Sequence, residues 1–129
     1  MRKLTANIDP AEIGRITLDE ALALLPTADG KRSAAVFEHG TLQVKLYAPR
    51  GSDPQSPHTR DEVYVVARGE GWFVIGERSG EPSKERRHRF GANDVLFAPA
   101  GTRHRFENFS DDLAVWVMFY GPEGGERDK

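Results

Sequence analysis

The sequence PAGTRHRFEN occupies residues 99–108 and joins a proline–glycine turn to a short run that alternates like a strand. Successive side chains of a strand point to opposite faces, so His104, Phe106 and Asn108 share one face. The charged side chains between them share the other face, which we expect to be in water. His104 is therefore expected to point into the protein beside a phenylalanine. Two interpretations are open: a core histidine that hydrogen-bonds a backbone carbonyl, or a metal ligand.

A second group of chemically useful residues lies upstream, in the sequence SPHTRDE at residues 56–62. His58 and Glu62 are four positions apart, and a β-rich run follows Glu62. Neither face of that run is plainly polar, so we expect Glu62 to be buried. A buried carboxylate is costly unless it is paired or binds a metal. An ion pair with Arg60 or Arg103 and ligation of a metal are equally weighted explanations.

Together the two groups supply two imidazoles and one carboxylate, from His58, Glu62 and His104. This ligand set is typical of iron, manganese, nickel or zinc in an open, reactive site, where water or substrate fills the remaining positions. The sequence therefore predicts one divalent transition metal, whose identity the ligand set does not fix.

The two groups resemble the paired motifs of the cupin superfamily, over residues 40–120. In the first motif, two histidines one residue apart precede a glutamate and then a glycine; the residues matching its later positions are His58, Glu62 and Gly69. The second motif has a leading glycine, then Pro-x-Gly-x-x-His and an asparagine; its matches are Pro99, Gly101, His104 and Asn108. The resemblance implies an all-β fold, the cupin double-stranded β-helix, which is a jelly-roll-like barrel.

Two positions depart from the cupin pattern. Ser56 stands where the family has its first histidine, and Asn93 stands where the second motif has its leading glycine. Asparagine tolerates left-handed backbone geometry, so we expect the turn at Asn93 to survive. At position 56 the missing ligand is replaced by the serine hydroxyl, by the amide of Gln55 or by water, and we favour water.

Six side chains in or next to these motifs are candidates for lining the cavity: Gln55, Ser56, Arg60, Tyr64, Phe106 and Asn108. Small-molecule sites need mostly apolar walls with a few placed polar groups, and this set supplies both. Arg60 is either a partner for a substrate carboxylate or a solvated side chain, and we favour the second.

The chain as a whole predicts one domain with three parts. Residues 1–32 form an N-terminal extension with one short helix, because Thr17 and Glu20 have capping-box spacing and a proline follows. Residues 33–120 form the cupin barrel. Residues 121–129 are rich in glycine and charge and form a flexible tail.

Within the barrel, roughly seven or eight short strands separated by turns indicate a sandwich or barrel. Residues 42–46 alternate like a strand with one buried face. Residues 113–120 are apolar at every position, so both faces of that strand should be covered. The run Gly69-Glu70-Gly71, between two β-rich segments, predicts a tight hairpin.

Composition excludes several classes of protein. The 129 residues include no cysteine, which excludes disulfides and thiolate metal sites. The formal charge of −2 and the short basic stretch at residues 84–89 do not supply the basic surface that nucleic-acid binding needs. No apolar run reaches the length of a membrane span, and the N-terminus lacks the apolar core of a signal peptide. We therefore expect a cytoplasmic protein that binds neither nucleic acid nor a membrane.

Three functions are consistent with these residues, and the fold alone does not separate them. The first is a metal-dependent enzyme of oxygenase, isomerase or decarboxylase type acting on a small organic molecule, with no separate general base identifiable. The second is a non-catalytic module that binds a small ligand. The third is a metal-free sugar-modifying cupin, in which His58 and either Tyr64 or Tyr120 form the histidine–tyrosine pair that the resemblance implies. The resemblance also implies a homodimer, with residues 33–39 crossing its interface.

Overall fold

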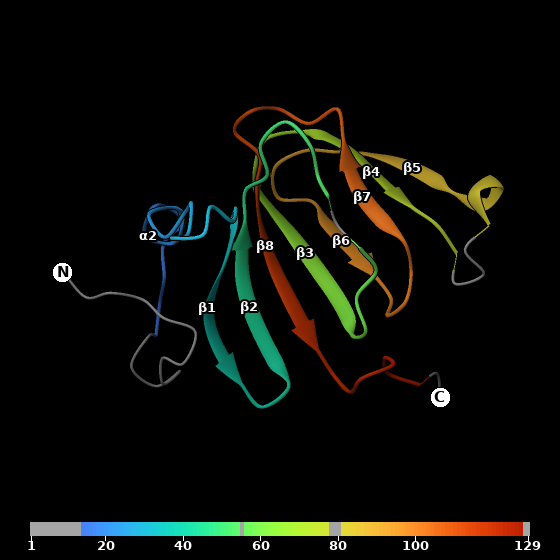
Figure 1. The fold of residues 1–129 in the computed structure, drawn as a ribbon, viewed down its shortest axis with the longest axis horizontal. Helices are drawn as coiled ribbons and strands as arrows, with labels where there is room; N and C mark the ends of the chain where they lie inside the picture. Colours follow the sequence, from blue (N-terminus) through green and yellow to red (C-terminus); the bar gives the residue numbers. More distant parts are fainter. Residues whose placement is uncertain (1–13, 55, 78–80, 128–129) are drawn as a thin grey trace.

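The computed structural model describes residues 14–54, 56–77 and 81–127, which fold into two antiparallel β-sheets packed face to face (Figure 1). The larger sheet has the strand order β1-β2-β8-β3-β6, and the smaller has β5-β4-β7. The elements are α2 (Leu18–Leu22), β1 (Ser33–His39), β2 (Leu42–Tyr47), β3 (Asp61–Arg68), β4 (Gly71–Ile75), the 3-10 helix η1 (Pro82–Lys84), β5 (Arg86–Phe90), β6 (Val95–Ala98), β7 (His104–Glu107) and β8 (Ala114–Tyr120). The predicted all-β jelly-roll-like architecture with a short N-terminal helix is confirmed. Among the described residues, no helix has the length and apolar character needed to cross a membrane.

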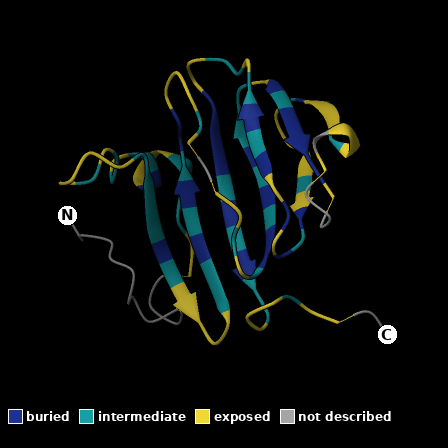
Figure 2. Cartoon of the chain, turned by 45° about the vertical axis from the view of Figure 1, so that its right-hand side comes forward, coloured by how far each residue is buried: buried dark blue, intermediate teal, exposed yellow. Residues whose placement is uncertain are grey.

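The main core fills the space between the two sheets. Tyr64 and Val66 of β3 meet Phe73 of β4 and Phe106 of β7 there. The Tyr64 ring packs edge to face against Phe73 and Phe106, with centroids 5.8 and 5.1 Å apart. Aromatic pairs favour this arrangement because the ring edge is positive and the ring face negative. Figure 2 shows the resulting alternation of buried and partly buried residues along the strands.

A second apolar cluster lies on the outer side of the larger sheet, against α2. Its fully buried members are Ala21, Val36, Leu46, Ala48 and Ala114. The helix begins at a capping box in which Thr17 and Glu20 accept hydrogen bonds from each other's backbone N–H groups. Leu18 and Leu22 then lie on its apolar face and pack onto the sheet. The predicted helix start and its packing on the outside of the barrel are confirmed.

Strand β2 turns its polar face, not its apolar face, toward the space between the sheets. Paired residues on neighbouring strands share a face of the sheet. Leu46 pairs with Trp116 of β8 on the side of the helix, whereas Lys45 pairs with Val117. Val117 belongs to the core between the sheets, so Lys45 points inward.

The predicted hairpin at Gly69-Glu70-Gly71 is wrong. Strand β3 pairs with β8 and β6, whereas β4 pairs with β5 and β7, so this segment crosses from one sheet to the other. Gly69 has φ of 96°, and a Cβ there would lie 2.7 Å from Cα of Leu113. Glycine is needed because two backbone segments come close where the chain changes sheets.

Strand β8 is the central strand of the larger sheet, and the coverage of its two faces differs. On the inner face, Val117 and Phe119 are buried. On the outer face, Trp116 packs against the helix cluster and Met118 is only half-buried. The expectation that both faces are covered therefore holds for the inner face and only in part for the outer one.

The described part of the C-terminal segment makes specific contacts with the barrel. The Gly124 N–H donates to the Thr59 carbonyl at 2.6 Å, and the Glu126 N–H donates to Oδ2 of Asp61 at 2.8 Å. These bonds place the segment beside the loop that leads into β3. The flexibility of residues 121–129 and the three-part division of the chain stay predictions.

Candidate metal centre

Three potential ligand atoms meet where the two sheets come together. His58 lies in the loop before β3, Glu62 is the second residue of β3, and His104 is the first residue of β7 in the other sheet. Oε1 of Glu62 lies 3.1 Å from Nε2 of His104 and 3.8 Å from Nε2 of His58. One ligand atom from each residue can be chosen so that all three lie within 4.8 Å of one another. The structure thus brings together the three candidate ligands.

The turn between β6 and β7 aligns these residues. Gly101 has φ of 78°, and its N–H donates to the His58 carbonyl at 2.7 Å. The Ala100 N–H donates to Oδ1 of Asp61 at 2.9 Å. The proline–glycine turn is therefore fastened to the loop that carries His58. Because β7 begins at His104, only three residues after Gly101, the turn also fixes where His104 lies.

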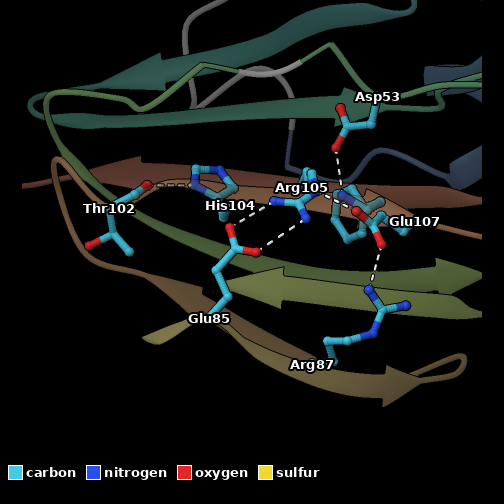
Figure 3. A network of polar contacts seen from close by, with 8 residues as sticks. Asp53, Glu85, Arg87, Thr102, His104, Arg105 and Glu107 are labelled. Carbon is cyan, nitrogen blue, oxygen red and sulfur yellow. Dashed lines mark hydrogen bonds and ion pairs between the residues drawn. The ribbon is translucent and has the colours of Figure 1, made fainter. Parts of the chain in front are cut away.

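Hydrogen bonds orient the His104 ring. Nδ1 lies 3.0 Å from the Thr102 carbonyl (Figure 3), and since a carbonyl only accepts, Nδ1 carries the donated proton. In the neutral ring Nε2 is then the acceptor nitrogen, and it lies 2.9 Å from the Tyr64 hydroxyl, which donates to it in this tautomer. The bond from Nδ1–H to a backbone carbonyl fixes the tautomer and the orientation of the ring. Such a bond is the usual support of a histidine that binds a metal through its other nitrogen.

Glu62 gives the strongest indication of a cation. Its side chain is 2% exposed, and among the described residues Oε1 has no hydrogen-bond partner, although it faces two imidazole nitrogens. Ligands around one ion, bound at about 2.1 Å, lie about 3.0–3.4 Å apart. The observed separations are of this size or slightly larger. Two nitrogens and a buried oxygen in this arrangement fit a divalent transition metal.

The two histidines have opposite pKa shifts. Burial lowers the pKa of His58, and the attraction of the Glu62 carboxylate offsets this only in part. Burial also acts to lower the pKa of His104, but the nearby Glu62 carboxylate and the hydrogen bond to the Thr102 carbonyl outweigh it and leave the pKa raised. Without a cation, a proton on His104 partly compensates the buried carboxylate, so protons and metal compete for this site.

A family model described as a cupin domain matches residues 43–120. The chain belongs to the cupin family. The motif residues therefore carry a family likeness as well as a common location.

Two relatives and one solved structure define the similarity. An uncharacterised protein of Streptomyces coelicolor is 33% identical over 108 residues, which are 82% of this cupin and 94% of that protein. Auxin-binding protein 1 of Arabidopsis thaliana is 30% identical over 90 residues, covering 65% of this cupin but 46% of that protein. A crystal structure from Bacillus halodurans has a TM-score of 0.67 and 17% identity, covering 94% of this cupin and 88% of that chain. At that identity, the structural likeness shows the fold alone.

The departures from the cupin motifs have clear structural outcomes. Asn93 has φ of 75°, so the predicted left-handed turn is confirmed, and its N–H donates to the Val66 carbonyl at 2.7 Å. Ser56, at the position of the family's first histidine, is exposed and lines the cavity. Gln55, the alternative oxygen donor, lies outside the described residues.

The cavity beside the candidate ligands has a volume of about 630 Å³. His58, Glu62 and Tyr64 lie in its wall. So does Tyr47, whose hydroxyl donates to Asp53, and burial raises the pKa of this phenol so that it stays neutral. The other carboxylate oxygen of Asp53 accepts the Phe106 N–H at 2.7 Å (Figure 3), which ties the loop before β3 to β7. The bonds of Asp53 with Tyr47 and Phe106 thus fix the position of the loop that forms part of the cavity wall.

Three of the candidate lining residues lie elsewhere. Phe106 is in the main core, and Arg60 donates to the Thr41 carbonyl with its guanidinium 5.9 Å from the centre of the Phe119 ring. Asn108 is exposed and has φ of 48°. It follows β7, where the left-handed backbone ends the strand alternation, so it does not share the inward direction of His104. The expectation that Asn108 lines the cavity is therefore corrected.

The sequence also left open an ion pair between Glu62 and an arginine. In the structure the charged neighbours of Glu62 are His58 and His104, whereas Arg60 binds the Thr41 carbonyl and Arg103 is exposed. Sequence reasoning overlooked a basic residue of this cavity, Lys45. The alternation of residues 42–46 shows that Lys45 shares a face with Gln43. It does not tell which face of the strand is turned toward the cavity.

Proposed function

We propose that this cupin binds one divalent transition metal through His58, Glu62 and His104 and acts on a small organic molecule held in the cavity. The observation that carries the proposal is the buried Oε1 of Glu62, which faces two imidazoles without accepting a hydrogen bond. An uncompensated buried carboxylate is costly, and a bound cation removes that cost.

The chain's own residues prepare the site for such chemistry. Thr102 and Tyr64 orient the His104 ring, and the apolar side chains Val117 and Phe119 line the cavity and limit its water content. When bound, a divalent metal supplies Lewis-acid chemistry by polarising an oxygen of the substrate. With protein ligands on one side and the cavity on the other, an oxygenase, isomerase or decarboxylase reaction suits this site.

Metal analysis tests the first half of the proposal. Protein purified without a metal-affinity tag is expected to contain close to one transition-metal ion per chain. His104→Ala is expected to abolish that content, whereas His88→Ala, which changes an exposed histidine of β5, keeps it. Equal metal content in wild type and His104→Ala would contradict the assignment.

A second candidate function is a binding module without turnover. Among the described residues of the cavity wall, the ionisable groups besides the three candidate ligands are lysines, arginines and tyrosines, so no carboxylic acid or further imidazole is placed for proton transfer. A relative named as an auxin-binding protein also favours it. If metal-loaded protein turns over none of a broad panel of organic acids, alcohols and sugars, binding without chemistry becomes the better description.

The metal-free sugar-modifying alternative has less support. The Tyr64 hydroxyl hydrogen-bonds to His104, and Tyr120 follows the outward-facing residues Trp116 and Met118 in the alternation of β8. Buried Glu62 between two imidazoles favours a cation instead. Detection of sugar epimerisation by metal-free protein would reverse this order.

For the assembly, we propose a homodimer in the cytoplasm without nucleic-acid partners. Strand β1, which we expect to cross the interface, is an edge strand paired with β2 of its own chain. No described strand pairs with its other edge, which supports pairing with a second copy there. Light scattering coupled to size exclusion is expected to give twice the chain mass, and a monomer mass would contradict the proposal.

A further inference from the structure

The cavity of this cupin has a strong imbalance of charge. Among the described residues that line it, four are basic, namely Lys31, Arg32, Lys45 and Arg50, and only Glu62 carries a carboxylate. If a divalent cation occupies the candidate metal centre, the excess positive charge grows further. Closely spaced like charges with little water between them attract anions strongly.

We propose that the cavity selects a small organic carboxylate, and that Lys45 binds its carboxylate group beside the metal centre. The proposal rests on the proposed metal-binding function and adds to it the class of ligand and the residue that recognises it.

Lys45 is placed at the right depth for this role. It is half-buried on the inner face of β2, between β1 and the central strand β8, and it lines the cavity. Its charge acts on both Glu62 and His58, so its ammonium group lies within electrostatic range of the candidate ligands. An anion in the open space beside the metal centre therefore lies between two sources of positive charge.

In the part of the chain that the structure describes, Lys45 also has no partner of its own. No described residue forms a hydrogen bond or ion pair with its ammonium group, although burial is strong enough to lower the pKa of this lysine. An ammonium group taken from water without a partner destabilises the protein unless a ligand supplies the missing interaction. The chain thus keeps a costly charge in the cavity wall.

The other basic residues of the wall already have partners for part of their donor groups. Nε of Arg32 donates to the Ala48 carbonyl at 2.9 Å, and Arg50 donates to the Pro49 carbonyl at 3.0 Å. Lys31 is exposed and lies 3.6 Å from Asp29. Each arginine thus uses part of its guanidinium on backbone carbonyls, whereas Lys45 donates to none of the described residues and keeps all its donors open to a ligand.

The walls near Lys45 indicate what is attached to the carboxylate. Tyr47, Val117 and Phe119 contribute largely apolar surface, and the ring of Phe119 lies 5.0 Å from that of His58. An apolar or aromatic body packs against these walls, while the carboxylate reaches Lys45. Phenylacetate has this chemistry, and phenylacetamide has nearly the same shape without the charge.

Calorimetric titration with these two compounds tests the proposal. Wild-type protein is expected to bind phenylacetate at least about 10-fold more tightly than phenylacetamide, both with zinc and without it, because a hydrogen bond to a charged group contributes that much. Lys45→Met is expected to bring the two affinities close together in the metal-free protein. Lys31→Met, which removes the same charge from the cavity rim, is expected to keep most of the preference.

Three further measurements separate the possible outcomes. Zinc titration of each variant shows whether the metal site is intact, so absence of zinc binding in wild type refutes the proposed function, while the metal-free arm still tests Lys45. The thermal midpoint of metal-free Lys45→Met is expected to equal or exceed that of wild type, because an unpaired buried charge has been removed. Lys45→Arg is expected to restore the preference in part.

Three results would overturn the proposal. They are equal binding of acid and amide by wild type, no phenylacetate binding at millimolar concentration, and a preference for the acid that survives Lys45→Met.

Discussion

Strand β7 carries ionisable side chains on both of its faces, and the two faces differ in how those groups are satisfied. His104 points inward and is 5% exposed, while its neighbour Arg105 points outward and has a side chain that is 35% exposed. Each lies in a cluster of acids and bases contributed by several strands. In the outer cluster every charged group has a partner, whereas in the inner cluster one carboxylate oxygen lacks a donor among the described residues.

The outer cluster is a network of partly exposed ion pairs (Figure 3). Arg105 donates to the carboxylates of Glu85 and Glu107, and Arg87 donates to Glu107 at 2.6 Å. These hydrogen bonds from arginine lower the pKa of both glutamates. The guanidinium of Arg87 also lies 5.4 Å from the centre of the Trp72 ring. Every charge in this network has a partner and also has access to water.

The inner cluster is buried and incomplete. Glu62 is nearly inaccessible to water, and one of its oxygens has no hydrogen-bond donor. Its neighbour Asp61 is equally buried, at 3% exposed, but accepts backbone N–H groups from Ala100 and Glu126. The comparison teaches that burial alone does not mark a functional carboxylate. A buried carboxylate oxygen that lacks a donor among the described residues is the better indication of a binding site, because a cation or a proton must offset the cost of its charge.

The largest expected effect comes from Glu62→Gln, a change of nearly the same shape. We expect metal affinity to fall by more than about 100-fold, because the loss of groups that merely support ligands already costs 10–100-fold. Stability of the metal-free protein is expected to stay within about 1 kcal/mol, because a poorly satisfied charge is removed. Zinc titration by calorimetry and urea unfolding measure the two quantities. Glu107→Gln makes the same chemical change in the outer cluster and should leave zinc affinity unchanged; equal losses in both variants would break the comparison.

Asp61→Ala is expected to have the next largest effect, and on a different quantity. It leaves two backbone N–H groups without their charged acceptor, so we expect the free energy of unfolding to fall by about 3 kcal/mol. Urea unfolding of the metal-free protein checks this value. Asp111→Ala, at an exposed position, is the matched control and should change stability by less than about 0.5 kcal/mol. If Asp61→Ala has the same free energy of unfolding as its control, the hydrogen-bonded carboxylate of Asp61 does not stabilise the fold.

Arg105→Ala is expected to have the smallest effect. Exposed ion pairs contribute little, so we expect a loss of stability below about 1 kcal/mol, further reduced in high salt. Because the folded-state pKa values of Glu85 and Glu107 are lowered, the contribution is complete above their ordinary value of 4.5 and is lost as pH falls through the lowered values. Unfolding of wild type and variant at neutral and acidic pH, in low and high salt, measures it. A difference that grows in acid would contradict this account.

Much of the candidate site was accessible to sequence reasoning because short-range rules govern it. Alternation placed His104 inward, and the lack of a polar face after Glu62 indicated its burial. The left-handed turn at Asn93 followed from the conformational tolerance of asparagine. Alternation fails where the backbone leaves the strand, and Asn108 was therefore misplaced.

Other features depend on which strands pair, and local sequence does not contain that information. The glycines around Glu70 suit a hairpin equally well, but the chain changes sheets there because β8 occupies the place beside β3. Glycine is needed at position 69 because its backbone lies close to that of Leu113, a residue far away in the sequence.

The sequence by itself determined the fold family, the three donor side chains and the inward direction of two of them, because motif spacing and strand period are local properties. Only the tertiary structure decided that His104 meets His58 and Glu62 across two sheets, and that one oxygen between them has no donor. It also decided that Lys45 faces the cavity, since a helix covers the apolar side of β2. The period of a strand fixes which residues share a face, but the direction of that face is set by the elements that pack against it.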